Sequence, residues 1–340
     1  MRDTPKPDIP RDSWAEVPRM APAAVKRPAE GGRAALARTV APSPMAPGAG
    51  RDPHRVHRVL RKEFPLTFDP LLRAWVLSRF ADVACALTDA RFTHGHRPGD
   101  PPCARSHVDV DEAELRAVAA RTARLLARRL ADRPRVDLVA DYCHWLPAGT
   151  VAAATGVPYR DMMRLVRGRA ASALAGQCSA QIAVREKALA SFLANVLLDP
   201  DLVAALRDAP SDLIARAWTE SLRRDPPVQI AVRRTSAPVR VSGGTLPEGA
   251  PVALLVGSAG RDPERFRAPD RYDPFRDDPG QLTYGHGACP AVLLARFEAE
   301  YALRALFEAM PAIRIADGYR PEQTGLITRG PANLFVRPRG

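Results

Sequence analysis

The sequence is poor in lysine and in aromatic residues. Phenylalanine, tyrosine and tryptophan together make up only 6% of the chain. Only four of its 50 basic residues are lysines, so the formal net charge of +12 comes from arginine. Arginine-rich surface can bind phosphate, nucleic acid or an acidic partner. However, alanine, arginine and proline are high together, which favours a general compositional bias. Nucleic-acid binding is not predicted, because no basic run carries interleaved aromatic residues.

Long apolar runs are also missing. No stretch approaches the roughly 18 apolar residues of a membrane-spanning helix, and the N-terminus lacks the apolar core of a signal peptide. These absences predict a cytoplasmic protein without a membrane partner. The cysteines are few, scattered and odd in number, and a chain of this length buries a core without disulfides, so at least one free thiol is predicted. No Gly-x-Ser-x-Gly motif or phosphate-binding loop occurs.

Residues 1–50 differ in composition from the remainder. They hold nine prolines and a single aromatic residue, Trp14, and show neither helical nor strand periodicity. This composition predicts a disordered tail with no binding role, followed by one domain over residues 51–340.

The domain is predicted to be mainly α-helical with a minor β-sheet. Apolar spacing and capping residues indicate helices from Asp111, Val136, Ala188, Ser211 and Leu293, and a strand and short helix over residues 75–83. Short β-type runs follow at residues 228–234, 239–241 and 252–256, separated by glycine and proline turns. Residues 262–279 are predicted to be irregular.

Three local patterns occur in order in the second half of the chain. The first is Glu220-x-x-Arg223 on a predicted helix. The second runs from Arg261 to Phe266 and from Pro269 to Tyr272, and the third is Tyr284-Gly-His-Gly-Ala-Cys289 directly before a helix. In this order and spacing, with Ala-Arg-Phe-Glu298 after the cysteine, the sequence resembles the cytochrome P450 superfamily from about Arg51 to Arg337.

The resemblance implies a cytochrome P450 fold, a heme b cofactor and a monooxygenase or other oxidoreductase of specialised metabolism. It implies Cys289 as the axial thiolate ligand of the heme iron, with Gly285 and Gly287 in the same loop. A small-molecule substrate and a ferredoxin-type electron donor would be the partners. The resemblance also implies a propionate contact at Arg233, with adjacent Arg234 as an equal physical candidate, and a buried network of Glu220, Arg223 and Arg271.

Several features depart from the family's pattern. The ligand loop is two residues short, because only Ala288 stands between Gly287 and Cys289. Ala183 and Val184 occupy the positions of the acid and alcohol that relay protons to bound oxygen, and Ser179 and Glu186 straddle them in the wrong order. No second propionate-binding helix is predicted between Phe92 and Asp111, and the domain is shorter than usual.

These losses are similar to those of heme-free P450-derived helper proteins, which stabilise or activate antibiotic glycosyltransferases. A heme-free partner protein is therefore the alternative function, and a decaying P450-like protein is a third. If heme binds, the missing acid and alcohol favour peroxide as oxidant. A separate hypothesis, zinc binding by His94, His96, Cys103 and His107, is weak because their spacing matches no common zinc site.

Overall fold

A computed structural model describes residues 41–93, 111–155, 158, 161, 173–283 and 290–339. The compact unit begins at Ala41, ten residues before the predicted boundary at Arg51. Ala49 is buried, and the carbonyl oxygen of Gly50 accepts a hydrogen bond from Arg329 Nη1 at 2.7 Å. Residues 41–50 therefore belong to the folded unit, because they pack on it. The predicted disorder of residues 1–40 lies outside the described residues.

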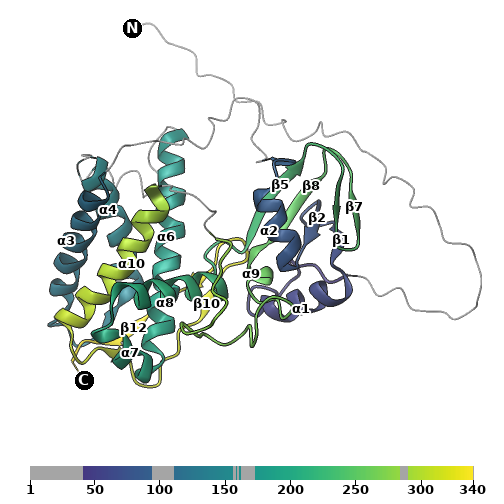
Figure 1. Ribbon diagram of the computed structural model, residues 1–340. Coiled ribbons are helices and arrows are strands. Elements are labelled where there is room, and N and C mark those ends of the chain that lie inside the picture. Colours follow the sequence, from purple (N-terminus) through teal and green to yellow (C-terminus); the bar gives the residue numbers. More distant parts are fainter. Residues whose placement is uncertain are drawn as a thin grey trace, which may run out of the picture. The chain divides into compact units, whose positions relative to one another are not determined.

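Helices dominate the described chain, as predicted (Figure 1). They are α1 (Pro53–Glu63), α2 (Phe80–Thr88), α3 (Glu112–Leu130), the π-helix η1 (Val139–Cys143), α4 (Trp145–Thr155), α6 (Ala173–Leu197), α7 (Pro200–Arg207), α8 (Ser211–Arg224), α9 (Val256–Ala259) and α10 (Pro290–Ala309).

Polar residues set several of the helix starts. The Asp111 carboxylate accepts a hydrogen bond from the Ala113 amide at 2.9 Å and caps α3, and Asp199 caps α7 in the same way. The start of α8 at Ser211 is as predicted, but the Ser211 hydroxyl does not cap the helix. It donates instead to Glu300 Oε1 on α10 at 2.6 Å.

The strands form one main sheet and three small ones. The strands are β1 (Leu66–Asp69), β2 (Ala74–Leu77), β3 (Phe92–Thr93), β4 (Val136–Asp137), β5 (Ile230–Thr235), β6 (Val239–Val241), β7 (Gly244–Leu246), β8 (Pro251–Leu255), β9 (Arg314–Ile315), β10 (Gln323–Thr324), β11 (Gly330–Pro331) and β12 (Phe335–Arg337). The main sheet has the order β1-β2-β8-β5-β3, in which β2 and β8 are parallel and the other neighbours antiparallel.

The helix predicted to begin at Val136 is wrong at its start. Val136 and Asp137 form a strand that pairs with Val336 and Phe335, and η1 begins only at Val139. Pairing with residues about 200 positions away determines this strand, and such a contact leaves no local pattern in the sequence.

The largest core cluster lies among α3, η1, α4, α6, α8 and α10. Phe192 of α6 meets Trp218 of α8 edge to face, with ring centroids 5.6 Å apart. The hydroxyl of buried Tyr142 lies 3.3 Å from the carbonyl oxygens of Ala123 and Ala302. Burial of each such large side chain contributes roughly 1.5–3 kcal/mol, so this cluster fixes these helices against one another.

No single helix in the described part of the chain is long and apolar enough to cross a membrane. Residues 182–197 of α6 together with α7 meet the criteria of length and composition, but the two segments are bent by 105°.

Candidate functional site

The buried charge cluster predicted around Glu220 and Arg223 is present in the structure. The Glu220 cluster, as we call it, consists of Glu220 and Arg223 on α8 and Arg276 in the irregular segment. Arg223 Nε and Nη2 donate to the two carboxylate oxygens of Glu220 at 2.7 and 2.8 Å. Arg276 Nε donates to Glu220 Oε2 at 2.9 Å. All three side chains are buried, so each charge depends on the others for compensation.

Arg271 was predicted to be the third charge of this cluster, and that role is wrong. Arg271 contributes only its carbonyl oxygen, which accepts from Arg223 Nη2 at 3.0 Å, and the residue is exposed. The chain turns after Tyr272 and brings Arg276 to the carboxylate instead. The sequence thus located the correct segment but placed the cation five residues too early.

Arg223 also joins α8 to the segment after α9. Its Nη1 donates to the carbonyl oxygens of Gly260 and Pro269, and its guanidinium lies 5.0 Å from the ring centroid of Phe266. A Cβ at Gly260 would lie 2.0 Å from the carbonyl oxygen of Arg223. This close approach requires glycine, so the cluster is a rigid support.

The predicted iron-ligand loop lies outside the described residues. Gly285, Gly287 and Cys289 all belong to it, so their placement remains a prediction. The described chain resumes at Pro290 with the first turn of α10. This start agrees with the prediction that a helix follows Cys289 directly.

Arg233, predicted to bind a propionate, lies on β5 and is half-buried. Its Nη1 donates to the carbonyl oxygen of Val232 at 2.8 Å, and burial alone lowers the pKa of its guanidinium. Among the described residues it has no carboxylate partner, so an anion would fit there. Arg234 is exposed and donates to the carbonyl oxygen of Gly249, away from that position.

The centre of α6 carries the two residues predicted at the proton-relay positions. Ala183 is exposed and Val184 is half-buried. These two positions are counted back from Asp199-Pro200, which resembles the end of the family's oxygen-activating helix region. In the structure, Asp199 is the N-cap of α7, which begins at Pro200. Neither a methyl nor an isopropyl group can transfer a proton.

The next residue on α6, Arg185, forms a buried ion pair that sequence reasoning missed. Its Nε donates to Glu298 Oε2 at 3.0 Å, and its Nη2 donates to the other carboxylate oxygen and to the carbonyl oxygen of Pro147. The Thr150 hydroxyl also donates to Glu298. Arg185 is 4% exposed and Glu298 1%. The pair therefore binds α6 to α10 and α4 in the interior.

The sequence held no local signal for this pair. Arg185 is followed by Glu186 and Lys187, a charged run that is typical of an exposed helix face. Its acidic partner is 113 residues away, so spacing could not identify it. The adjacent Glu186 forms a hydrogen bond of 2.8 Å between its carboxylate oxygen Oε2 and His144 Nδ1. Glu186 is thus engaged with His144 and does not occupy a predicted relay position.

Metal ligands other than the predicted thiolate are not assembled within the described ranges, where no group of three or more His, Cys, Asp or Glu could hold a metal ion. His94, His96, Cys103 and His107 lie outside those ranges. Of the cysteines described, Cys85 is exposed and Cys143 is buried, and burial raises the pKa of the Cys143 thiol.

Comparison with known proteins supports one family. The cytochrome P450 family model matches residues 213–286. Cytochrome P450 107B1 of Saccharopolyspora erythraea is 40% identical over 150 residues, which cover 42% of this chain and 36% of that protein. Protein DesVIII of Streptomyces venezuelae is 29% identical over 350 residues, which cover 85% of this chain and 86% of that one. The relatives with 34–43% identity are matched over 29–45% of their own length.

The fold comparison extends over most of the chain. Epothilone D-bound cytochrome P450epoK matches with a TM-score of 0.74 at 22% identity, covering 88% of this chain and 99% of that one. This likeness confirms the predicted fold, and the sequence matches agree with it. This chain is therefore similar to the cytochrome P450 superfamily in sequence over parts of its length and in fold over most of it.

Proposed function

We propose that this chain is a P450-fold protein of bacterial specialised metabolism that does not activate dioxygen. It acts instead by binding and stabilising a partner enzyme, such as a glycosyltransferase. The observation that carries the proposal is the centre of α6, where the positions of the proton relay hold Ala183 and Val184 and the next residue is locked in a buried ion pair.

Oxygen activation requires a group that delivers protons close to the oxygen. Arg185 does not replace that group, because its guanidinium already donates to Glu298, Pro147 and Thr150. Glu298 is itself held by Arg185 and Thr150. The polar groups next to the relay positions are thus committed to packing α6 against its neighbours.

Several relatives are named as cytochromes P450 or as a hydroxylase, so support for the partner role comes from this chain's own residues. The glycosyltransferase as partner comes from the sequence resemblance to helper proteins, and the arginine excess suits an acidic partner surface.

A heme-thiolate protein is the second candidate, and Arg233 is the observation that favours it. Its guanidinium has no carboxylate partner among the described residues and is partly desolvated, so it fits a propionate. In that case Cys289 would hold the iron and Gly285 and Gly287 would shape the loop. The bound heme would supply oxidation of a small molecule with electrons from a ferredoxin-type donor or with peroxide.

Heme titration separates the two candidates. The purified full chain is incubated with hemin, freed of excess, reduced and exposed to carbon monoxide. The proposal predicts no thiolate-type Soret band and an unchanged far-ultraviolet circular dichroism spectrum. A stoichiometric thiolate-type band that is lost in Cys289→Ala, while the folded spectrum is kept, would overturn it.

The partner role needs its own measurement. Candidate glycosyltransferases are co-expressed with this chain and analysed by size-exclusion chromatography and glycosyl-transfer assays. The proposal predicts a stoichiometric complex and a transferase that loses activity faster when this chain is omitted. Equal activity and lifetime with and without the chain would contradict the glycosyltransferase role.

A further inference from the structure

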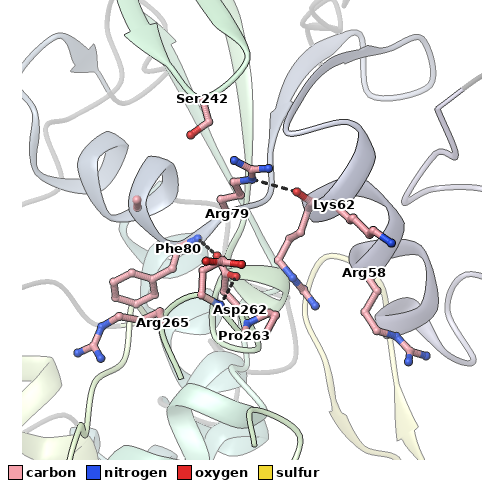
Figure 2. Close-up of a pocket in the computed structure, with 11 residues that line it drawn as sticks. Arg58, Lys62, Arg79, Phe80, Ser242, Asp262, Pro263 and Arg265 are labelled. Carbon is pink, nitrogen blue, oxygen red and sulfur yellow. Dashed lines mark hydrogen bonds between the residues drawn. The ribbon is translucent and has the colours of Figure 1, made fainter. Parts of the chain in front are cut away.

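A basic groove lies between α1, the start of α2 and the segment after α9. It has a volume of about 880 Å³ and is lined by five cationic side chains and two acidic ones. Figure 2 shows Arg58 and Lys62 extending from α1 on one side, Arg265 on the opposite side and Arg79 between them. None of these residues belongs to the candidate heme site.

Most of the positive charge in the groove is uncompensated. Arg58 and Lys62 are exposed and Arg79 is half-buried, and none of them forms an ion pair with a described carboxylate. Arg265 is different, because its Nη1 lies 3.0 Å from Asp278. Exposed cations without partners raise the local potential and attract anionic groups.

The acidic residues of the groove do not cancel this charge. Asp262 is buried, and its two carboxylate oxygens accept hydrogen bonds from the amides of Phe80 at 2.8 Å and Glu264 at 3.1 Å. These bonds start α2 and close a turn, and the negative charge of Asp262 partly offsets the positive charge of buried Arg61. Glu264 is the one exposed acid among the lining residues, which include five cations.

Arg79 is held in place by the fold. Its Nε donates to the carbonyl oxygen of Arg61 at 2.9 Å, which leaves its terminal nitrogens for an external acceptor. Arg61 is 7% exposed, and its Nη1 donates to the carbonyl and hydroxyl oxygens of Ser258, both at 2.9 Å. These buried contacts fix α1 against α9, so the cationic wall is preorganised.

The arrangement selects the kind of ligand. In Figure 2 the cationic groups spread along the groove and point in different directions instead of converging on one position. A single phosphate would meet only one of them, whereas an extended chain with several carboxylates can meet Arg58, Lys62 and Arg79 in turn. Phe80 and Pro263 add apolar contact area between the charges.

We propose that this groove docks an acidic segment of a partner protein. The inference rests on the proposed function as a partner protein, since it assigns the surface through which that role is carried out. Charge complementarity accelerates the association of the acidic segment with the groove and fixes its position there. The binding is expected to weaken with salt, because the cations are exposed.

The test uses a fluorescent glutamate-rich peptide as the probe and measures its anisotropy with the full chain at low and high salt. The groove variant is Arg58→Glu with Lys62→Glu. The matched control is Arg121→Glu with Arg129→Glu on α3, two exposed arginines that form no ion pair with described residues. Both variants carry the same change in net charge, so a difference between them reports location.

The groove variant is expected to weaken peptide binding at least about tenfold, equivalent to about 1.4 kcal/mol, and the control to change it little. Equal losses in both variants would show attraction to net charge alone and overturn the proposal. Tighter groove-dependent binding of an oligonucleotide of matched charge, or of inorganic phosphate, would also overturn it. Heme uptake is measured on the same samples. If the unsubstituted chain neither binds the peptide nor takes up heme, the groove alone is refuted, whereas a thiolate-type heme band would refute the proposed function.

Discussion

The sharpest test of the protein interior is to measure how much the buried ion pair of Arg185 and Glu298 contributes to stability. We expect Arg185→Met to be strongly destabilising, although methionine fills a similar volume. The substitution removes two donors to the Glu298 carboxylate and one each to Pro147 and Thr150. Glu298 is 1% exposed, so its charge would stay buried with only the Thr150 hydroxyl as partner.

The magnitude follows from that stranded charge. Removing one partner of a buried ion pair costs about 3–5 kcal/mol, whereas replacing both partners by apolar residues is often neutral or stabilising. The double variant Arg185→Met with Glu298→Met should therefore recover most of the loss. Thr150 and Pro147 stay paired with each other in it, because the hydroxyl already lies 3.1 Å from that carbonyl oxygen.

Urea unfolding followed by circular dichroism at neutral pH measures the free energies of both variants. The matched control is Arg128→Met, whose exposed side chain lies 3.3 Å from Glu308. Exposed pairs contribute no more than about 1 kcal/mol, so the control should stay near wild type. The reasoning is refuted if Arg185→Met costs no more than Arg128→Met, or if the double variant is as unstable as Arg185→Met alone.

Three further predictions follow from buried groups. Arg276→Met should cost about 3 kcal/mol, because it removes a cation from buried Glu220, whereas Arg271→Met should stay within about 0.5 kcal/mol; similar urea midpoints for the two variants would contradict this. Burial lowers the pKa of His57 to about 3, below the unfolded value of about 6.5. Its contribution to stability is therefore fully present above pH 6.5 and lost by about 1.4 kcal/mol per pH unit below it, and His57→Leu should flatten that fall in urea titrations at successive pH values. Thiol alkylation mapped by mass spectrometry should modify Cys85 in the native protein and Cys143 only after unfolding, because Cys143 is buried and burial raises its pKa; native labelling of Cys143 would count against this assignment.

Local patterns predicted those parts of the fold that local interactions determine. The spacing of Ile214, Trp218 and Leu222 in the sequence predicts one apolar face of the helix from Ser211, and the three residues lie on the buried face of α8. Asp111 caps α3. Val136 was misassigned because a strand partner at the other end of the chain decides its conformation. Helix caps and stripes need only neighbours in sequence, whereas short strands depend on distant pairing.

The candidate site shows the same division. The spacing in Glu220-x-x-Arg223 places both side chains on one face of α8, so their pairing follows from helix geometry. The choice of Arg276 over Arg271 depends on an irregular turn, and the contact between Arg185 and Glu298 depends on how α6 packs against α10. Neither arrangement has a periodic signature in the sequence.

The two buried charge networks balance their charges with this chain's own residues. The Glu220 cluster ties α8 to the segment that precedes residue 284, and the pair of Arg185 and Glu298 ties α6 to the helix that follows residue 289. Within the described chain, each carboxylate is compensated by guanidinium groups that belong to these helices and to the segment before the loop. Buried charges destabilise a fold only when they lack partners. Loss of an iron ligand in the loop would therefore leave no charge of these networks unpaired, so both networks should persist whether or not heme is bound.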